Sequence, residues 1–281
     1  MSGGPGPIVE VRGVSFRYGR NSPLVLDGLD VDVARGEVVG IAGRNGSGKS
    51  TLARLLNGLL RPTAGTVVVD GLDTSRNPVR RMAAHAGYAF QNPNHQLFAR
   101  TVATELAFGP RNLGLAEAEV AARVADAAGR LGLDSVLMRH PYHLERGARK
   151  LVAIAAVIAM GTPVLILDEP TTGQDRRTAA MVRRMIGELA AGGTTVVCIS
   201  HDMRLIADVA DRLVVLDGGR IVADASPRTV FADGAAMERA SLAPPQITRL
   251  ALSLGVGTGP WPAVSVEEAV DAVRRRRAGA P

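Results

Sequence analysis

The feature that most constrains this chain is a glycine-rich turn between an apolar segment and a helical segment. Residues 38–42 read Val-Val-Gly-Ile-Ala, as expected of a strand that is buried on both faces. Residues 43–50 follow as Gly-Arg-Asn-Gly-Ser-Gly-Lys-Ser, which matches the pattern G-x-x-x-x-G-K-[ST]. Residues 49–60 then show a helical pattern that ends at Gly58 and Pro62. A strand, this turn and a helix in that order predict a phosphate-binding loop.

The residues of this loop have a chemistry suited to a phosphate chain. Glycines let successive backbone N–H groups turn toward one anion, and the helix that follows points its N-terminus at the same anion. Lys49 supplies a point charge for the β- and γ-phosphates, and the Ser50 hydroxyl is placed to ligate Mg²⁺. The residues expected to contact a nucleotide here are Gly43, Arg44, Asn45, Gly46, Ser47, Gly48, Lys49, Ser50 and Thr51.

A second apolar strand ends in two acids, because residues 164–169 read Val-Leu-Ile-Leu-Asp-Glu. Asp168 can hold Mg²⁺ through its water shell, and Glu169 can polarise an attacking water as a general base. In isolation, two solvated acids at a strand end would look the same. In a chain that also carries a phosphate loop, they predict metal-assisted hydrolysis of a nucleotide.

Strand and helix patterns alternate along most of the chain, which implies an α/β fold with a mostly parallel sheet and helices on both faces. Helical patterns at residues 101–108, 116–131 and 146–160 follow one another without a strand between them, which suggests a helical insertion. Further strand patterns cover residues 8–18, 31–33, 66–70, 85–91, 194–200, 212–216 and 220–223.

The net charge of the chain bears on which kinds of molecule could be its binding partner. The 281 residues carry a net charge of +6, which would fit a nucleic acid or a membrane surface. Arginine could also simply replace lysine, since Lys49 and Lys150 are the only lysines. The run Arg274–Arg277 holds four of these charges and would fit anionic lipid, an acidic partner or a solvated helix end. We predict no nucleic-acid partner.

No segment of the sequence predicts a membrane span or a secretory signal. The longest nearly apolar stretch, residues 151–167, is shorter than the roughly 20 residues of a spanning helix and is broken at Gly161 and Pro163. The N-terminus, MSGGPGPIVEVRG, lacks a basic region followed by an apolar run. We therefore expect the chain to reach a membrane only through a partner.

With both motifs in place, the chain resembles the ATP-binding subunits of ABC transporters over essentially its whole length. Tyr18 matches the aromatic residue that stacks on adenine in that family. Gln91 falls at the family's Q-loop, which contacts Mg²⁺ and links the helical insertion to the core. His201, after the apolar strand 194–200, matches the switch histidine that contacts the γ-phosphate. The plainer alternatives are a core tyrosine, a surface glutamine, and a histidine that caps a helix or lies at the surface.

The resemblance implies a P-loop NTPase with a RecA-like core, an antiparallel β subdomain and a helical insertion over about residues 95–160. It places an ABC ATPase domain at residues 1–239 and a small C-terminal extension for subunit pairing at residues 240–281. ATP and Mg²⁺ are the implied cofactors. The implied catalytic residues are Lys49, Glu169 and His201, and the implied metal-binding residues are Ser50, Gln91 and Asp168.

Two segments narrow the resemblance to energy-coupling factor transporters, which import vitamins and cobalt or nickel. Residues 90–115, FQNPNHQLFARTVATELAFGPRNLGL, look like a segment typical of their ATPases. Residues 244–252 and 264–269 resemble the C-terminal extension that helps to pair two ATPase subunits. The implied partners are a second ATPase subunit, a membrane scaffold subunit and a substrate-capturing membrane subunit, with this chain peripheral at the cytoplasmic face of the cell membrane.

The sequence departs from the family in the signature motif LSGGQ, which contacts the ATP held by the partner subunit. Residues 144–148 here read Leu-Glu-Arg-Gly-Ala. Glu145 therefore turns an anion toward a phosphate, and like charges about 4 Å apart repel by about 4 kcal/mol at an effective dielectric near 20. Arg146 adds bulk, although its charge offsets part of this repulsion. In the D-loop, Gln174 and Arg176 stand where leucine and proline are usual.

These departures predict that the chain hydrolyses ATP at its own phosphate loop only when a paralogous subunit supplies an intact signature. Two other readings of them stay open: tolerated drift, and an ATP-gated structural subunit of a heterodimer with little hydrolysis. A third function, a non-transport ABC ATPase of DNA repair or translation, would fit the basic pI. Residues 90–115 and the lack of a second phosphate loop or a long coiled-coil insertion argue against it.

Overall fold

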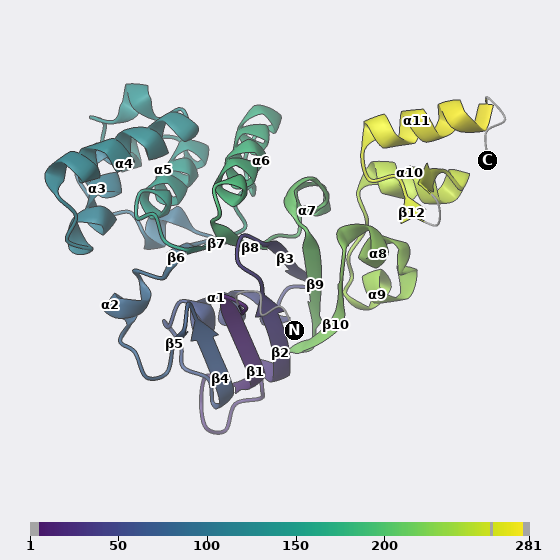
Figure 1. Ribbon diagram of the computed structural model, residues 1–281, viewed down its shortest axis with the longest axis horizontal. Helices are drawn as coiled ribbons and strands as arrows, with labels where there is room; N and C mark the ends of the chain where they lie inside the picture. The colour runs from purple at the N-terminus through teal and green to yellow at the C-terminus, as the bar shows by residue number, and fades with distance from the viewer. Residues whose placement is uncertain (1–5, 259–260, 278–281) are drawn as a thin grey trace.

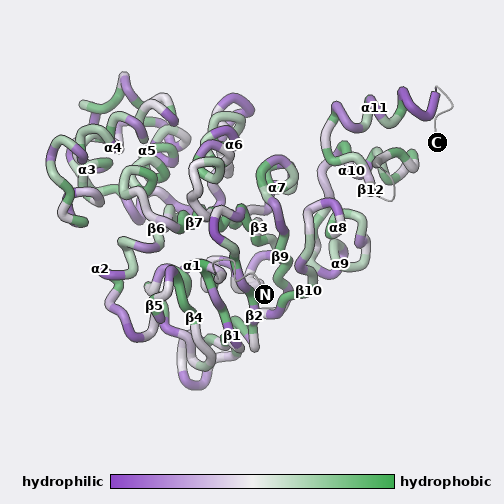
Figure 2. Tube along the Cα trace, in the orientation of Figure 1, coloured by the Kyte–Doolittle hydropathy of each residue, from purple (hydrophilic) through white to green (hydrophobic). Residues whose placement is uncertain are grey.

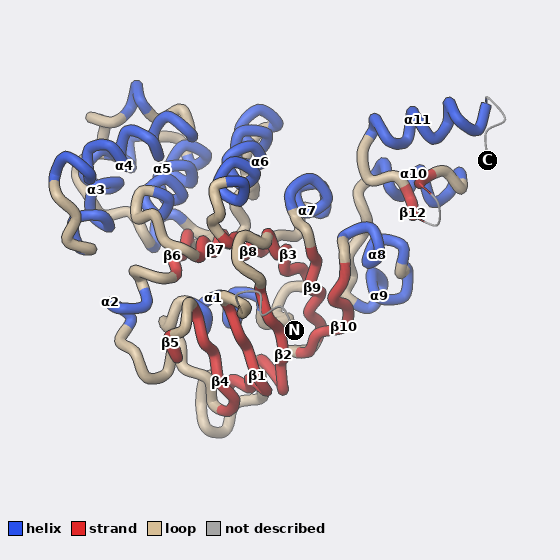
Figure 3. The backbone as a smooth tube through the Cα atoms, viewed as in Figure 1, coloured by secondary structure: helices blue, strands red, loops and turns tan. Residues whose placement is uncertain are grey.

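The computed structural model describes residues 6–258 and 261–277, so Met1–Pro5 of the N-terminal stretch lie outside it. The described residues form a four-stranded sheet ordered β2-β1-β4-β5 and a six-stranded sheet ordered β10-β9-β3-β8-β7-β6. Figures 1 and 3 show the helices α3–α5 at one end of the molecule and α10 and α11 at the other, with the sheets between them. This arrangement confirms the predicted α/β class with its antiparallel subdomain and helical insertion.

The antiparallel sheet covers one side of the phosphate-loop helix. Its strands β1 (Val9–Phe16), β2 (Leu26–Val33) and β4 (Ala64–Val69) turn alternate apolar side chains inward, and β5 (Leu72–Asp73) completes the edge. These side chains share one core with helix α1 (Lys49–Leu56) and with the near face of the six-stranded sheet. The sheet therefore fixes the helix that begins at Lys49.

The six-stranded sheet is parallel except at one edge, where β10 runs antiparallel to β9. Every residue is buried in β3, β6, β7 and β8, as expected of strands covered on both faces. The carboxyl ends of parallel strands meet at one edge of a sheet, which is where ligands bind in such folds. The strand bounds are β3 Val38–Gly43, β6 Ala86–Ala89, β7 Val164–Asp168, β8 Thr195–Ile199, β9 Arg212–Asp217 and β10 Arg220–Ala225.

Helix α1 ends four residues earlier than its sequence pattern predicted. Asn57 caps it, donating a side-chain hydrogen bond of 3.0 Å to the carbonyl oxygen of Ala86. Gly58 then turns the chain with φ of 77°, in a conformation that favours glycine. The short helix α2 (Val79–Met82) packs against this turn, with the Met82 side chain 3.0 Å from where a Cβ of Gly58 would lie.

The helical insertion contains α3 (Val102–Asn112), α4 (Glu117–Arg130) and α5 (Arg146–Ile158), with single-turn helices at Pro93–His95, Asp134–Val136 and Pro141–His143. The predicted end of α3 at residue 108 is wrong, because the helix continues through Pro110. Gly109 permits this course: a Cβ there would lie 2.5 Å from Met160 Cγ, so only glycine lets α3 approach the end of α5. Helices α6 (Arg176–Ala191) and α7 (Met203–Val209) return the chain to the sheet.

The C-terminal residues divide between the main core and a small separate cluster. Helices α8 (Pro227–Ala232) and α9 (Gly234–Arg239) bury Phe231 and Met237 in the main core. Helix α10 (Gln246–Leu254), the pair β11 (Gly257–Thr258) and β12 (Trp261–Pro262), and helix α11 (Val266–Arg277) follow. Their cluster consists of Ala251, Val256, Ala263, Ala269 and Ala272. The division at residue 240 stays a prediction, and α8, α9 and the small strands were not foreseen.

The apolar residues of the molecule concentrate in its central strands, and the end of α11 is hydrophilic. Figure 2 shows apolar residues along the central strands and a hydrophilic end to α11, where the exposed run Arg274–Arg277 lies. Among residues 6–258 and 261–277, none of the helices combines the length and apolar character needed to span a bilayer.

Candidate nucleotide-binding site

The phosphate loop connects β3 to α1, in the context that the sequence predicted. Two of its glycines have no room for a side chain. Gly43 has φ of 148°, and a Cβ there would lie 2.0 Å from the carbonyl oxygen of Leu216. Gly48 has φ of 100°, and its Cβ would lie 2.4 Å from a methyl group of Leu26. Close contact with neighbouring strands therefore restricts the loop to one backbone conformation.

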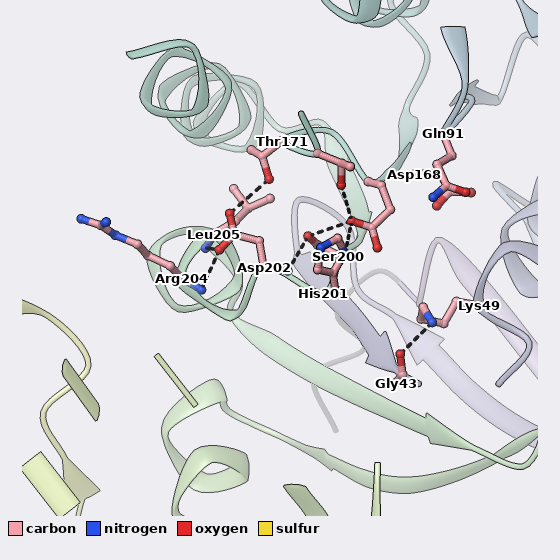
Figure 4. A network of polar contacts seen from close by, with 12 residues as sticks. Gly43, Lys49, Gln91, Asp168, Thr171, Ser200, His201, Asp202, Arg204 and Leu205 are labelled. Atoms are coloured by element: carbon pink, nitrogen blue, oxygen red, sulfur yellow. Dashed lines mark hydrogen bonds and ion pairs between the residues drawn. The ribbon is translucent and has the colours of Figure 1, made fainter. Parts of the chain in front are cut away.

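The ammonium group of Lys49 bends back over the loop. Its Nζ donates a hydrogen bond of 2.7 Å to the carbonyl oxygen of Gly43 (Figure 4) and one of 3.0 Å to that of Arg44. Burial lowers the pKa of Lys49, and the nearby carboxylates of Glu169 and Asp168 oppose that shift. A buried cation facing two acids marks the place where an anionic ligand and a metal ion can be held together.

The cavity side of the loop offers oxygen ligands as well as the ammonium group. Ser47 Oγ is buried without a hydrogen-bond partner among the described residues, but it lies toward Gly43 and does not line the cavity. The Ser50, Gln91 and Asp168 side chains offer hydroxyl, amide and carboxylate oxygens, which are the donors that Mg²⁺ prefers. The residues therefore fit both ATP phosphates and Mg²⁺.

A cavity of about 420 Å³ joins the loop to the acidic strand end. It brings together most of the residues that the sequence predicted, from α1, the end of β7 and the segments that follow β1, β3, β6 and β7. Its lining consists of Tyr18, Val25, Asn45, Gly46, Gly48, Lys49, Ser50, Thr51, Gln91, Asp168 and Glu169. Of the described residues that were predicted to bind nucleotide or to catalyse, Gly43, Arg44, Ser47 and His201 do not line it.

Tyr18 lies at the mouth of this cavity and not in the core. Strand β1 ends at Phe16, and Tyr18 is 59% exposed beyond it. Its ring stands edge-on to Phe16 with centroids 4.9 Å apart, and its hydroxyl lies 3.1 Å from Thr51 Oγ1. The alternative of a core tyrosine is wrong, because β1 is shorter than its pattern predicted. An exposed ring held in this way can receive a flat base.

Asp168 and Glu169 end β7 in different environments. Asp168 Oδ2 accepts a hydrogen bond of 2.9 Å from the hydroxyl of Tyr88 on β6. Burial and the nearby Asp168 raise the pKa of Tyr88, so the hydroxyl keeps its proton and donates. Glu169 is buried, with φ of 53°, and its amide donates 2.8 Å to the carbonyl oxygen of Ile199. A non-glycine residue in this region is uncommon and points to a functional position.

The carboxylate of Glu169 is held by three side chains. His201 Nδ1 lies 2.7 Å from Oε2, and the Thr172 and Ser200 hydroxyls lie 3.0 Å and 3.5 Å from it. The His201 side chain is 65% exposed and does not cap α7, because Asp202 accepts from the amides of Arg204 and Leu205 (Figure 4). The helix-capping alternative for His201 is therefore wrong.

Comparison with known proteins identifies the family. A sequence profile described as ABC transporter matches residues 26–172. The energy-coupling factor transporter ATP-binding protein EcfA2 of Symbiobacterium thermophilum is 42% identical over 281 residues, with 97% of each chain covered. This chain belongs to the ABC transporter family. It is an ABC ATPase of the energy-coupling factor type, a class that uses ATP with Mg²⁺.

Two further comparisons agree with that assignment. The energy-coupling factor transporter ATP-binding protein EcfA of Methanothermobacter thermautotrophicus is 42% identical over 245 residues, which are 86% of this ABC ATPase and 78% of the relative. The solved structure of cbiO1 from Clostridium perfringens, part of the ABC transporter complex cbiONQ, superposes with a TM-score of 0.74 at 31% identity. That superposition covers 89% of this ABC ATPase and 100% of the cbiO1 chain.

The altered signature of this ABC ATPase begins helix α5. Glu145 is the N-terminal cap residue, and no capping hydrogen bond from its side chain is present among the described residues. The side-chain amide of Gln174, in the D-loop, donates 3.0 Å to the carbonyl oxygen of Gly147. Neither Glu145 nor Arg146 lines the cavity of this chain.

Two residues that support the site were not found from the sequence. Tyr88 holds Asp168, and Lys150 on α5 donates to the carbonyl oxygens of Phe90, Gln91 and Asp168. Burial lowers the pKa of Lys150 to about 8. The signal for Lys150 was present, since it is one of two lysines in the chain. Nothing in the sequence singled out Tyr88.

Proposed function

We propose that this ABC ATPase binds and hydrolyses ATP as the peripheral subunit of an energy-coupling factor importer. One observation carries the proposal: a single cavity joins the Lys49 loop to Asp168 and Glu169. Lys49 and the loop amides would hold the phosphates, and Tyr18 would stack on the base. Mg²⁺, when bound through Ser50, Gln91 and Asp168, supplies charge neutralisation at the phosphates.

Glu169 would accept the proton of the attacking water. Its Oε2 is directed by the hydroxyl of Thr172 and by His201, while its backbone is anchored to β8. A base that is held by several neighbours loses little orientation freedom when the reaction occurs. His201 lies next to this base, and because it is exposed it could also reach a γ-phosphate placed over Lys49, as the family pattern implies.

A second ATPase subunit would complete the site with its own signature segment. This chain would give that partner a weakened site, because Glu145 would place a carboxylate beside the partner's phosphate. Pairing would use the C-terminal extension, whose small cluster leaves apolar side chains exposed on α10 and α11. These exposed side chains are Leu250, Leu252, Leu254, Val266 and Val270.

A membrane scaffold subunit would dock on the helical insertion, at the cytoplasmic face of the membrane. A groove of about 220 Å³ between β6, α3 and α5 is lined partly by Phe98 and Phe108, whose rings are 4.7 Å apart. Phe98 is 62% exposed, yet its amide is fixed by a 2.9 Å hydrogen bond to the buried Glu105. A rigid, exposed aromatic pair suits the apolar face of a short helix. The transported substrate, a vitamin or a transition-metal ion, would be captured by another subunit.

The proposal is tested by measuring ATP hydrolysis for the purified chain alone and with a paralogous ATPase subunit whose signature is intact. We expect very low activity alone and recovery on adding the paralogue. Vigorous activity from the chain alone would contradict the need for a partner signature. No hydrolysis in any pairing would instead favour an ATP-gated structural subunit, which the acidic Glu145 makes the second candidate.

A further inference from the structure

The buried ammonium group of Lys150 connects three parts of the molecule. Lys150 lies in the first turns of α5, the helix that starts at the altered signature. Its Nζ donates hydrogen bonds of 3.0 Å to Phe90 O, 2.7 Å to Gln91 O and 2.9 Å to Asp168 O. The first two carbonyl groups follow the end of β6, and the third belongs to the last residue of β7. One side chain thus joins the signature helix to both strand ends at the cavity.

The bonding of this ammonium group is unusually complete for a buried cation. Lys150 is 4% exposed, and an ammonium group has three N–H donors, all of which find a carbonyl oxygen here. Among the described residues it forms no ion pair with a carboxylate, because the side chain of Asp168 turns to Tyr88. The positive charge therefore rests on backbone carbonyl dipoles, and these fix the backbone on either side of the cavity.

Two of the three acceptors are the backbone of residues whose side chains line the cavity. Gln91 and Asp168 present an amide and a carboxylate there, as ligands for Mg²⁺. By binding their carbonyl groups, Lys150 fixes the backbone positions from which these two side chains extend. A displacement of α5 would carry Lys150 with it and would shift both side chains together.

Lysine is well suited to donate hydrogen bonds to three carbonyl groups at once. Of the 33 lysine and arginine residues, Lys49 and Lys150 are the only lysines. A guanidinium group is a planar fork, whereas an ammonium group can direct three donors at three converging carbonyl groups. The two lysines of this chain thus occupy the two buried positions where a compact cation binds backbone carbonyl oxygens.

We propose that Lys150 is a positioning residue that couples the placement of the signature helix to the Mg²⁺-binding side chains of Gln91 and Asp168. The coupling rests on the proposed nucleotide site, and it assigns a role to a residue outside that site. Its consequence is that a displacement of α5 changes how well the site holds the metal, and that metal binding in turn biases the position of α5.

The test measures how Mg²⁺ strengthens ATP binding by the full chain, using equilibrium binding of ATP with Mg²⁺ titrated and with the metal chelated. For Lys150→Met we expect unchanged metal-free ATP affinity and a rise of about tenfold or more in the Mg²⁺ concentration for half-saturation. Lys150→Arg should show the same direction of change, because charge alone does not restore the geometry. Lys150→Gln, which keeps two donors, serves if the methionine variant does not fold.

Arg123→Met is the matched control, because Arg123 also donates to a backbone carbonyl oxygen within the insertion, at 2.8 Å to Met160. Its Mg²⁺ half-saturation should equal that of the unchanged chain. Folded Lys150 variants with an unchanged Mg²⁺ half-saturation would overturn the proposal, as would an equal loss of metal-free and metal-bound affinity. If the unchanged chain binds no ATP at all, the proposed function fails first, so the two failures are distinguishable.

Discussion

The side-chain amide of Gln174 donates a 3.0 Å hydrogen bond to the carbonyl oxygen of Gly147, so the two segments that depart from the family touch each other. A Cβ at Gly147 would lie 3.0 Å from Gln174 Oε1, so a larger residue there would require the Gln174 side chain to shift. The acceptor is the backbone of Gly147, a position at which this signature keeps the glycine of LSGGQ.

Replacing Glu145 by Ser together with Arg146 by Gly should activate the purified chain. The change restores a hydroxyl donor and removes a carboxylate that opposes phosphate, a repulsion of about 4 kcal/mol at 4 Å before screening. We expect the ATP hydrolysis rate of the chain alone to rise by about tenfold or more, since about 1.4 kcal/mol suffices for that factor. Glu117→Ser, an exposed acid at the start of α4, is the control. An equal rate in the unchanged chain and the double variant would show that the signature does not limit activity.

Glu169→Gln should separate binding from hydrolysis. An amide keeps the shape of the side chain but accepts no proton, so hydrolysis by the paired subunits should fall by about 10²–10⁴-fold. ATP binding by the chain should change by less than about twofold, because Lys49 and the loop amides hold the phosphates. Exposed Glu238→Gln controls for loss of charge. Transport that persists in Glu169→Gln would favour the structural role over hydrolysis.

Gly43→Ala should destabilise the fold far more than Gly46→Ala. Both glycines have positive φ, but nothing lies within 4 Å of a Cβ at Gly46, whereas one at Gly43 would lie 2.0 Å from Leu216 O. Backbone strain alone costs about 1–2 kcal/mol, and overpacking adds about 1–3 kcal/mol. Denaturant unfolding of the two variants measures the difference. Equal losses of stability would mean that the loop moves freely away from β9.

Asp70→Asn should change how stability depends on pH. Hydrogen bonds from His85 at 2.9 Å and Arg35 at 2.7 Å lower the pKa of Asp70. A carboxyl group with a lowered pKa stabilises the fold above its unfolded pKa of about 4, and this contribution disappears as the pH falls through the folded value. We expect Asp70→Asn to lose about 1 kcal/mol at pH 7 and nothing in strong acid. Urea unfolding across pH measures this, and a loss at pH 7 that persists unchanged in strong acid would contradict it.

Local patterns were sufficient to predict most strands and the position of the phosphate loop. The loop was readable because its glycines, Lys49 and Ser50 are contiguous in sequence, and β7 was readable because an unbroken apolar run ends in acids. The predicted ends of some helices were wrong, because contacts with residues distant in sequence help to determine where a helix ends. Helix α3 continues through Pro110, next to the close approach of Gly109 to Met160, and α1 stops at Leu56, where Asn57 bonds to Ala86.

The residues that support the site were harder to predict because their partners are distant in sequence. Tyr88 and Asp168 are 80 residues apart, and Lys150 Nζ reaches the Phe90 carbonyl group across 60 residues. Such pairs follow from the order of strands in the sheet, which places β6 beside β7. Composition gave one clue, the scarcity of lysine, without indicating what the ammonium group would bind.

The small cluster of the C-terminal extension has a practical consequence for protein engineering. Among the described residues, the buried side chains of this apolar cluster are four alanines and one valine, which is little apolar volume for a segment of this size to fold by itself. Ala240 and Leu242 pack with the main core, as does Val264 of the extension. A stop codon placed just after Leu242 should yield a folded, ATP-binding cassette without the proposed pairing segment, whereas the excised extension should give the circular dichroism of an unstructured peptide.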